Sequence, residues 1–261
     1  MRAEEEESDM ANTIATSIGN ALLERLFVRG TVTEAEAITP RMRRLRIHAP
    51  ALSQLPYQPG QQVRVQVGAL FGLEMVKGDM LRTYSVWQHS REQASLELCT
   101  LDHPGRGPGA RWASGVSAGT AVSFRAPEGK FVVRRHTGLH LLLGDETASV
   151  ALGAIARAVP SGGRVVGLLE TESAHERLPM PTTSELSWVV RGARPTGDIG
   201  PLTDALRSVA PTLTPAAERT AYLAGEARAI KALRAILLEQ GWSSRDILVK
   251  PFWMPGKKGL E

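Results

Sequence analysis

The first half of the chain consists of short segments rich in β-branched residues, separated by Pro and Gly. Six of them are expected to be strands, at residues 30–38, 42–49, 61–67, 81–87, 94–101 and 120–126. Short strands at this spacing, with turn signals such as Tyr57-Gln58-Pro59-Gly60 between them, indicate an antiparallel barrel or sandwich. Before them, apolar residues recur at every fourth position from Ile14 to Leu26 and predict a helix that ends near Phe27.

The second half alternates continuous apolar runs with helical patterns. The runs are expected to be strands, at residues 139–144, 164–170, 187–192, 220–226 and 246–253, and the helical patterns end near Val159, Val209 and Gln240. Apolar strands alternating with helices imply a parallel sheet covered on both faces. The pattern changes near His136. We therefore expect a leader and helix (1–27), a six-stranded antiparallel β-barrel (28–135) and a Rossmann-like parallel α/β sandwich (136–261).

Composition and charge narrow the class of protein. A chain of 261 residues, 43% of them hydrophobic, can bury the cores of two domains. The net charge of +4 comes from scattered arginines, with no basic block longer than Arg43-Arg44 or Lys257-Lys258, so no nucleic-acid footprint is expected. Cys99 is the only cysteine, which excludes an internal disulfide and a cysteine-bound metal centre within one chain. An acidic start and the lack of a long apolar run lead us to expect a cytoplasmic protein without a membrane span.

Two short motif matches are discounted. Residues 105–110 fit the dinucleotide fingerprint G-x-G-x-x-G/A, but that fingerprint needs a long helix after it, and only about residues 109–114 can be helical here. Residues 115–119 fit the G-x-S-x-G elbow of α/β-hydrolases, with Asp145 and His175 following in hydrolase order. The elbow needs a strand before its serine and a helix after it, and this chain predicts the reverse. A turn that enters a strand explains these residues better.

Arg82-Thr83-Tyr84-Ser85 lies in a predicted strand of the barrel. R-x-Y-S/T at this place, ahead of an α/β module, resembles the flavin motif of the ferredoxin-reductase superfamily. Within it, the chain resembles the siderophore-interacting proteins, which are flavin-dependent ferric-siderophore reductases. The resemblance covers about residues 28–255. It rests on ITPRMRRLRI, PGQQVRV, LRTYSV, GPGARWASG, LLLGDETA, AYLAGEARAIKALR and the final FW.

The resemblance implies a bound FAD. Arg82 would meet its phosphates, the Tyr84 ring would pack beside the isoalloxazine or ribityl chain, and Ser85 would lie near the reactive edge of the flavin. The start of the short helix would offer free N–H groups to the pyrophosphate. His103 is either a cofactor contact or a solvated loop histidine. The implied cofactor-binding set is Arg82, Thr83, Tyr84, Ser85, His103, Gly107, Pro108, Gly109, Ala110, Asp145, Thr147, Ala148 and Trp253.

Two of the expected site residues in the α/β module, Asp145 and Trp253, have a second interpretation. The resemblance implies that Asp145 and its neighbours line the FAD side of the cleft between the modules, but Asp145 would also suit a helix cap. Gly225 and Glu226 resemble the turn that a pyridine nucleotide would approach. Trp253 matches an aromatic residue close to the flavin, and it could equally be a core tryptophan.

Basic side chains at the cleft mouth are expected to attract anionic ferric chelates. The candidates are Arg64, whose place in the family is typically lysine, together with Lys130 and Lys250; the alternative for each is a solvated surface. The chain departs from the family at Met254, where a basic residue is common, and at residues 126–129, where a G-P-x-G turn is common. These departures put the siderophore specificity in doubt more than the flavin site.

The expected function is FAD-dependent reduction of Fe(III) in a siderophore, which needs no nucleophile from the protein and no metal site. The alternatives are a general NAD(P)H:flavin oxidoreductase without an iron role and a non-enzymatic siderophore-binding protein. The electron donor is left open among NADH, NADPH and reduced ferredoxin, and a ferredoxin would suit the positive charge. Glu170, Glu172 and Glu176 follow the second α/β strand and disfavour the 2′-phosphate of NADPH.

Overall fold

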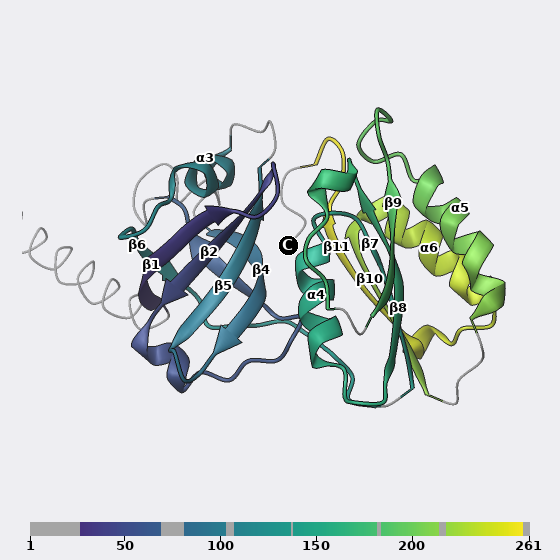
Figure 1. The fold of residues 1–261 in the computed structure, drawn as a ribbon, viewed down its shortest axis with the longest axis horizontal. Helices are drawn as coiled ribbons and strands as arrows, with labels where there is room; N and C mark the ends of the chain where they lie inside the picture. The colour runs from purple at the N-terminus through teal and green to yellow at the C-terminus, as the bar shows by residue number, and fades with distance from the viewer. Residues whose placement is uncertain are drawn as a thin grey trace, which may run out of the picture.

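A computed structural model describes residues 27–68, 81–102, 107–136, 138–181, 184–213 and 218–257. The helix predicted over residues 14–26 and the loop residue His103 lie outside these ranges. Two modules lie side by side (Figure 1): a closed β-barrel, and a layered unit of helices and a parallel sheet. No helix among these residues is long and apolar enough to cross a membrane.

The first module is the antiparallel barrel that the short segments predicted. Its strands are β1 (Val28–Ala37), β2 (Met42–His48), β3 (Gln62–Gln66), β4 (Leu81–Ser90), β5 (Ser95–Leu101) and β6 (Ala121–Phe124). They follow the order β1-β2-β5-β4-β3-β6, and β6 pairs with β1 to close the barrel. Between β5 and β6, the short helix α3 (Pro108–Gly115) packs Trp112 against the barrel core. The six-stranded barrel is therefore confirmed.

Alternating side chains explain why these segments form a barrel. In β3, Val63 and Val65 are fully buried, while Arg64 between them is partly exposed. In β2, Leu45 and Ile47 are buried with the same period of two. Successive side chains of a strand point to opposite faces, so one apolar row from each strand fills the interior.

The second module confirms the predicted alternation of strands and helices. Its strands are β7 (Leu139–Gly144), β8 (Arg164–Thr171), β9 (Glu185–Val190), β10 (Arg219–Glu226) and β11 (Ile247–Trp253), all parallel, in the order β11-β10-β7-β8-β9. Its helices are α4 (Ser149–Ala158), α5 (Gly200–Val209) and α6 (Ala227–Glu239). Helix α4 covers the sheet face toward the barrel, and α5 and α6 cover the other face (Figure 1). Every residue of β7 is buried, as expected for a strand covered on both faces.

An apolar contact joins the modules where α4 packs against β4. Trp87 of β4 is buried there, and the Arg157 guanidinium lies 3.8 Å from the centroid of its ring. Gly153 permits the approach, because a Cβ at that position would lie 2.5 Å from the Trp87 ring. This contact packs helix α4 of the α/β module against strand β4 of the barrel.

The loop that follows α3 has the geometry of a turn. Ser117 and Thr120 close it, since the Thr120 amide donates to the Ser117 carbonyl oxygen at 3.1 Å and the Ser117 amide donates to the Thr120 hydroxyl at 3.2 Å. The element before Ser117 is helix α3 and the element after it is strand β6. This order is the reverse of a nucleophile elbow, which supports discounting the hydrolase motif.

Candidate functional site

Strand β4 and the start of α3 converge on Gly109. The Tyr84 hydroxyl donates to the Gly109 carbonyl oxygen over 3.3 Å, and burial raises the pKa of Tyr84, so this hydroxyl stays protonated. A Cβ built on Gly109 would lie 2.9 Å from Cγ of Arg82, so the glycine lets the Arg82 side chain pass close to the helix. Arg82 and Tyr84 therefore reach the same helix end, as their spacing of two residues in one strand predicts.

The N-terminus of α3 is open. Gly107 is its N-cap residue, Pro108 opens the first turn, and no side chain in the described part of the chain caps this end. A Cβ added to Gly107 would meet no atom of the described residues within 4 Å. The amides of Gly109 and Ala110 belong to the first turn, where no helix carbonyl can accept from them. Free amides at the positive end of a helix, with an arginine beside them, suit a pyrophosphate.

A basic group forms where β3, the turn after β6 and β11 meet. Nε of Arg64 lies 2.8 Å from Oε1 of Glu128, and reciprocal backbone hydrogen bonds between Gln62 and Glu128 hold that turn against β3. Lys250 reaches the same turn from β11, its Nζ 3.9 Å from the Cβ position of Gly129. The structure thus brings together two of the three basic candidates, while Lys130 is exposed at the next position of the turn.

The electrostatics of this group affect Lys250 most. The pKa of Lys250 is lowered to about 8, mainly by burial; Glu128 opposes the shift, and the positive charge of Arg64 contributes to it. The Nζ atom also lies 5.6 Å from the centroid of the Phe252 ring. Lys250 is therefore charged at neutral pH but titrates far below the usual range of a lysine.

Asp145 ties together the ends of three parallel strands. At the end of β7, its Oδ1 accepts from the Thr147 amide at 2.9 Å, the Thr147 hydroxyl at 2.5 Å and the Ala148 amide at 3.3 Å. Its Oδ2 accepts from the Glu226 amide of β10 at 2.8 Å and from Nε1 of Trp253 of β11 at 2.9 Å. Burial raises the pKa of Asp145, and hydrogen bonds from Thr147, Trp253 and Glu226 oppose that rise.

Glu226 is buried and caps helix α6. Its Oε2 accepts from the Ala229 amide at 2.8 Å, and its Oε1 lies 3.1 Å from Nε of Arg228. Gly225, just before it, has φ of +121°, and a Cβ there would lie 2.5 Å from the Asp145 carboxylate. The missing side chain at Gly225 is what allows Asp145 to reach the Glu226 amide.

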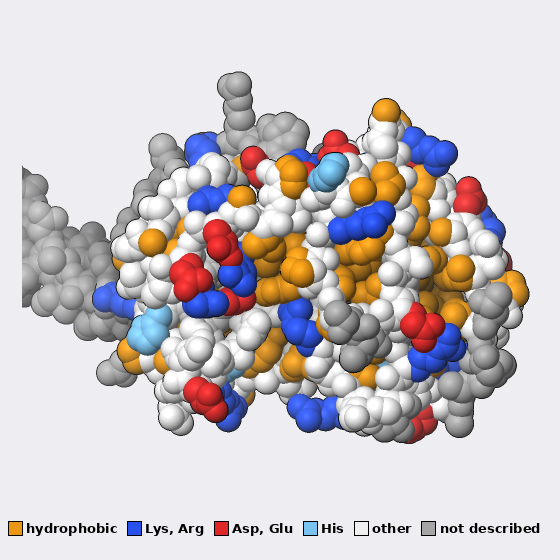
Figure 2. Space-filling view, viewed as in Figure 1, with side chains coloured by type: hydrophobic (Ala, Val, Ile, Leu, Met, Phe, Trp, Pro, Cys, Tyr) orange, Lys and Arg blue, Asp and Glu red, His pale blue; other side chains and the backbone are white. Residues whose placement is uncertain are grey.

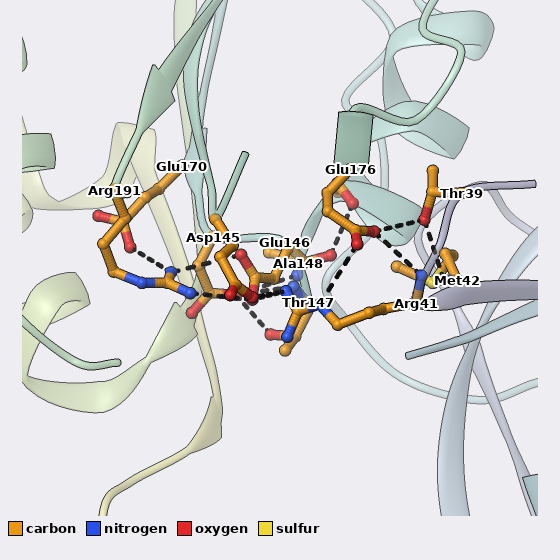
Figure 3. A network of polar contacts seen from close by, with 12 residues as sticks. Thr39, Arg41, Met42, Asp145, Glu146, Thr147, Ala148, Glu170, Glu176 and Arg191 are labelled. Atoms are coloured by element: carbon orange, nitrogen blue, oxygen red, sulfur yellow. Dashed lines mark hydrogen bonds and ion pairs between the residues drawn. The ribbon is translucent and has the colours of Figure 1, made fainter. Parts of the chain in front are cut away.

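A network of ion pairs crosses from the barrel to the α/β module (Figure 3). Arg41, in the β1–β2 turn, lies 2.8 Å from Glu146, 2.8 Å from Glu172 and 3.5 Å from Glu176. Thr39 donates its hydroxyl proton to Glu176 over 2.6 Å. These pairs could not be predicted from the sequence pattern, because the partners are more than 100 residues apart.

On the α/β side the network continues through Arg191, which is buried and pairs with Glu146 at 3.3 Å and with Glu170 at 2.9 Å. Glu170, Glu172 and Glu176, which the sequence presented as a possible discriminator of nucleotides, thus all take part in ion pairs within the chain. Among the described residues, no group of His, Cys, Asp and Glu side chains is placed to hold a metal ion.

Two family models cover most of the chain. A siderophore-interacting FAD-binding domain matches residues 73–131, and the siderophore-interacting protein model matches residues 137–256. The chain belongs to the siderophore-interacting protein family. Among curated proteins, it is 25% identical over 216 residues to the ferric vibriobactin reductase ViuB of Vibrio cholerae, covering 77% of this chain and 79% of that protein.

Solved structures of family members share the fold. A siderophore utilization protein from T. fusca is 24% identical with a TM-score of 0.76, covering 90% of this chain and 95% of that one. The siderophore-interacting protein SipS of Aeromonas hydrophila is 20% identical with a TM-score of 0.69, covering 87% and 98%. The ferredoxin reductase in carbazole 1,9a-dioxygenase, 18% identical, has a TM-score of 0.68 and covers 87% and 69%. The ferredoxin-reductase-like fold is therefore confirmed.

The family's FAD fits the residues present. Strand β4 and helix α3 both lie within the matched FAD-binding region. There a guanidinium comes together with a helix end that no described side chain caps and with Gly107, whose Cβ position is clear of the described atoms. The roles of the individual side chains stay predictions, including those of Thr83, Ser85, Thr147, Ala148 and Trp253.

Proposed function

We propose that this member of the family is an FAD-dependent ferric-siderophore reductase, which reduces Fe(III) held in a chelate so that Fe(II) is released in the cytoplasm. The observation that carries the proposal is the convergence of Arg82 and Tyr84 on the open end of α3, together with the basic group of Arg64 and Lys250 at the neighbouring strand β3. A site for an anionic cofactor and a second site for an anionic chelate are what such a reductase needs. The similarity to a ferric vibriobactin reductase supports the same conclusion.

In this proposal, the residues of β4 and α3 bind and position the cofactor. Arg82 and the amides of Gly109 and Ala110 hold the pyrophosphate, with a planar guanidinium suited to paired anionic oxygens. Tyr84 keeps its proton and fixes the start of α3 against β4. FAD, when bound, supplies the electrons that reduce the iron. No side chain is asked to act as a nucleophile.

The basic group acts on the substrate. Arg64 and Lys250 carry positive charge at neutral pH, and Lys130 adds an exposed charge at the next turn position. A ferric chelate with net negative charge is attracted to this mouth of the site, which raises its local concentration. Glu128 neutralises part of the charge and positions Arg64.

The test is an anaerobic mixing experiment. The purified protein is loaded with FAD, the flavin is reduced by light, and the reduced protein is mixed with ferric chelates of different charge. We expect flavin binding, followed by reoxidation that becomes faster as the chelate becomes more anionic. A general flavin reductase would bind flavin but show no such reoxidation, and a siderophore-binding protein without redox function would bind the chelate without flavin. Either result would exclude the proposed activity.

A further inference from the structure

The carboxyl ends of the parallel strands enclose a pocket whose lining is acidic. Asp145, Glu170, Asp198 and Glu226 contribute to it, and the described residues that line it include no Lys or Arg. The enclosed part has room for about one water molecule. In open α/β sheets this is the place where a dinucleotide binds, with its pyrophosphate on a helix N-terminus.

Carboxylates of the chain itself occupy the helix starts around this pocket. Asp145 accepts from the amides of Thr147 and Ala148 just before α4. Asp198 accepts at 3.0 Å from the amide of Gly200, the first residue of α5. Glu226 accepts from the amide of Ala229 in the first turn of α6. Carboxylates thus accept from backbone amides just before α4, at the first residue of α5 and in the first turn of α6, and among these three helices α6 alone has a side-chain cap.

The Glu226 amide, between β10 and α6, also has an internal acceptor, because it donates to Oδ2 of Asp145. The positive φ of Gly225 and its missing side chain make room for that contact. A pyrophosphate could bind the amides of Thr147, Ala148 and Glu226 only by displacing the buried Asp145 carboxylate, which links β7, β10 and β11.

The arginines near this pocket do not reverse its negative charge. Arg191 is buried between Glu146 and Glu170, which outnumber it. Arg228 pairs with Glu226 and donates to the Gly197 carbonyl oxygen at 3.2 Å. An incoming pyrophosphate would thus meet unfavourable charge as well as occupied amides.

We propose that Asp145, Asp198 and Glu226 are specificity-determining residues that keep pyridine dinucleotides out of this pocket, so that the flavin takes its electrons from a donor that does not enter it. The inference rests on the proposed function, since it concerns how the flavin of that reductase is reduced. It replaces the expectation that a nicotinamide approaches Gly225 and Glu226. Of the donors expected from the sequence, it excludes NADH and NADPH.

The first measurement is stopped-flow reduction of the FAD-loaded protein by NADH and by NADPH, with photoreduction as the reference for full reduction. We expect no saturation with either nucleotide up to about 1 mM, the upper end of ordinary KM values. Saturable reduction with a half-maximal concentration below that limit would overturn the inference. Reoxidation by a ferric chelate, followed in the same preparation, tests the proposed function separately.

The second measurement is binding of ADP-ribose, which carries the pyrophosphate without the nicotinamide. Asp198→Asn and Glu226→Gln keep an oxygen acceptor for the helix amides but remove the charge, so the caps are retained. We expect weak binding to the parent protein and tighter binding to each variant, by about two- to fivefold for each charge removed. The affinity of the double variant is compared with those of the single variants.

Asp204→Asn is the matched control, because Asp204 lies on α5 outside the pocket and pairs with Arg207 at 3.3 Å on the surface. We expect it to bind ADP-ribose no better than the parent protein. If the two pocket variants gave no improvement, or if Asp204→Asn improved binding equally, the carboxylates would not be the determinants of specificity. Flavin content and the unfolding midpoint of each variant show whether it has folded.

Discussion

Helix α3 of the barrel module begins at a glycine that no described side chain caps, whereas helix α6 of the α/β module begins at a buried glutamate that caps its own first turn. Both helices present the same backbone chemistry, with unpaired amides at the positive end of a dipole. Arg82 lies against the start of α3, while Asp145 and Glu226 occupy the start of α6. The side chains alone decide which helix end can receive an external anion.

The comparison shows why the positions of glycines are informative. Among the described residues, no atom lies close to the Cβ position of Gly107, as a site for a ligand requires. Gly225 borders the Asp145 carboxylate at a distance that no side chain could tolerate. Both glycines precede a helix, but one leaves room for a partner from outside the chain and the other makes room for a partner from within it.

The largest expected effect comes from adding a side chain at Gly225, where the Asp145 carboxylate occupies the Cβ position. Gly225→Ala introduces a Cβ that overlaps the Asp145 carboxylate at a residue with φ of +121°. Because backbone strain and a displaced buried carboxylate add together, we expect a loss of about 3 kcal/mol in the free energy of unfolding. Urea denaturation measures it.

Gly107→Ala is the matched control for that substitution, since its Cβ meets no atom within 4 Å in the part of the chain that the structure describes and its φ is −68°. We expect it to cost at most about 1 kcal/mol, the usual penalty of alanine at an N-cap. Equal losses in the two variants would show that the Asp145 contact is not what Gly225 protects.

A smaller effect is expected when the cation beside the open helix end is removed. Arg82→Ala deletes the guanidinium that lies against Gly109. Charge-assisted hydrogen bonds are worth about 1.5–3 kcal/mol, so we expect FAD affinity to fall by about 10- to 100-fold. Quenching of flavin fluorescence on titration measures it.

Arg82→Lys separates charge from geometry, because lysine retains the positive charge without the planar fork. Its FAD affinity should lie between those of the parent protein and Arg82→Ala. If Arg82→Ala bound FAD as tightly as the parent protein, the open end of α3 would not be the pyrophosphate site.

The sequence predicted the elements of this fold well because each module has a simple pattern. The apolar run at residues 139–144 coincides with β7, since a parallel strand buried on both faces has no polar position to blur its ends. The short helix predicted at about residues 109–114 corresponds to α3, which extends one residue further at each end, from Pro108 to Gly115. The flavin motif was found only through family resemblance, as a four-residue stretch in a strand has no distinctive period.

The contacts around Asp145 could not be predicted from the pattern. They depend on β7, β10 and β11 being neighbours in the sheet, and the order of strands is not encoded in their hydrophobicity. Asp145 was considered as a helix cap, but its bonds to Glu226 and Trp253 join residues that are 81 and 108 positions away. The ion pair between Arg41 and Glu146 could not be predicted either, because its partners are also far apart in the sequence.

The smallest expected effect concerns charge at the mouth of the proposed chelate site, which is basic where the α/β pocket is acidic. The pKa of Lys250 is lowered to about 8, so its ammonium group is present below that pH and is lost as the pH rises through it. We expect the affinity for an anionic ferric chelate to fall by about threefold between about pH 7 and pH 9. Lys250→Arg should remove this decline, because the guanidinium stays charged throughout.

The ratio of the two affinities at each pH cancels any titration of the chelate itself, and Lys130→Arg at the exposed neighbouring position should retain the decline. An equal decline in Lys250→Arg would mean that another group controls the approach of the substrate.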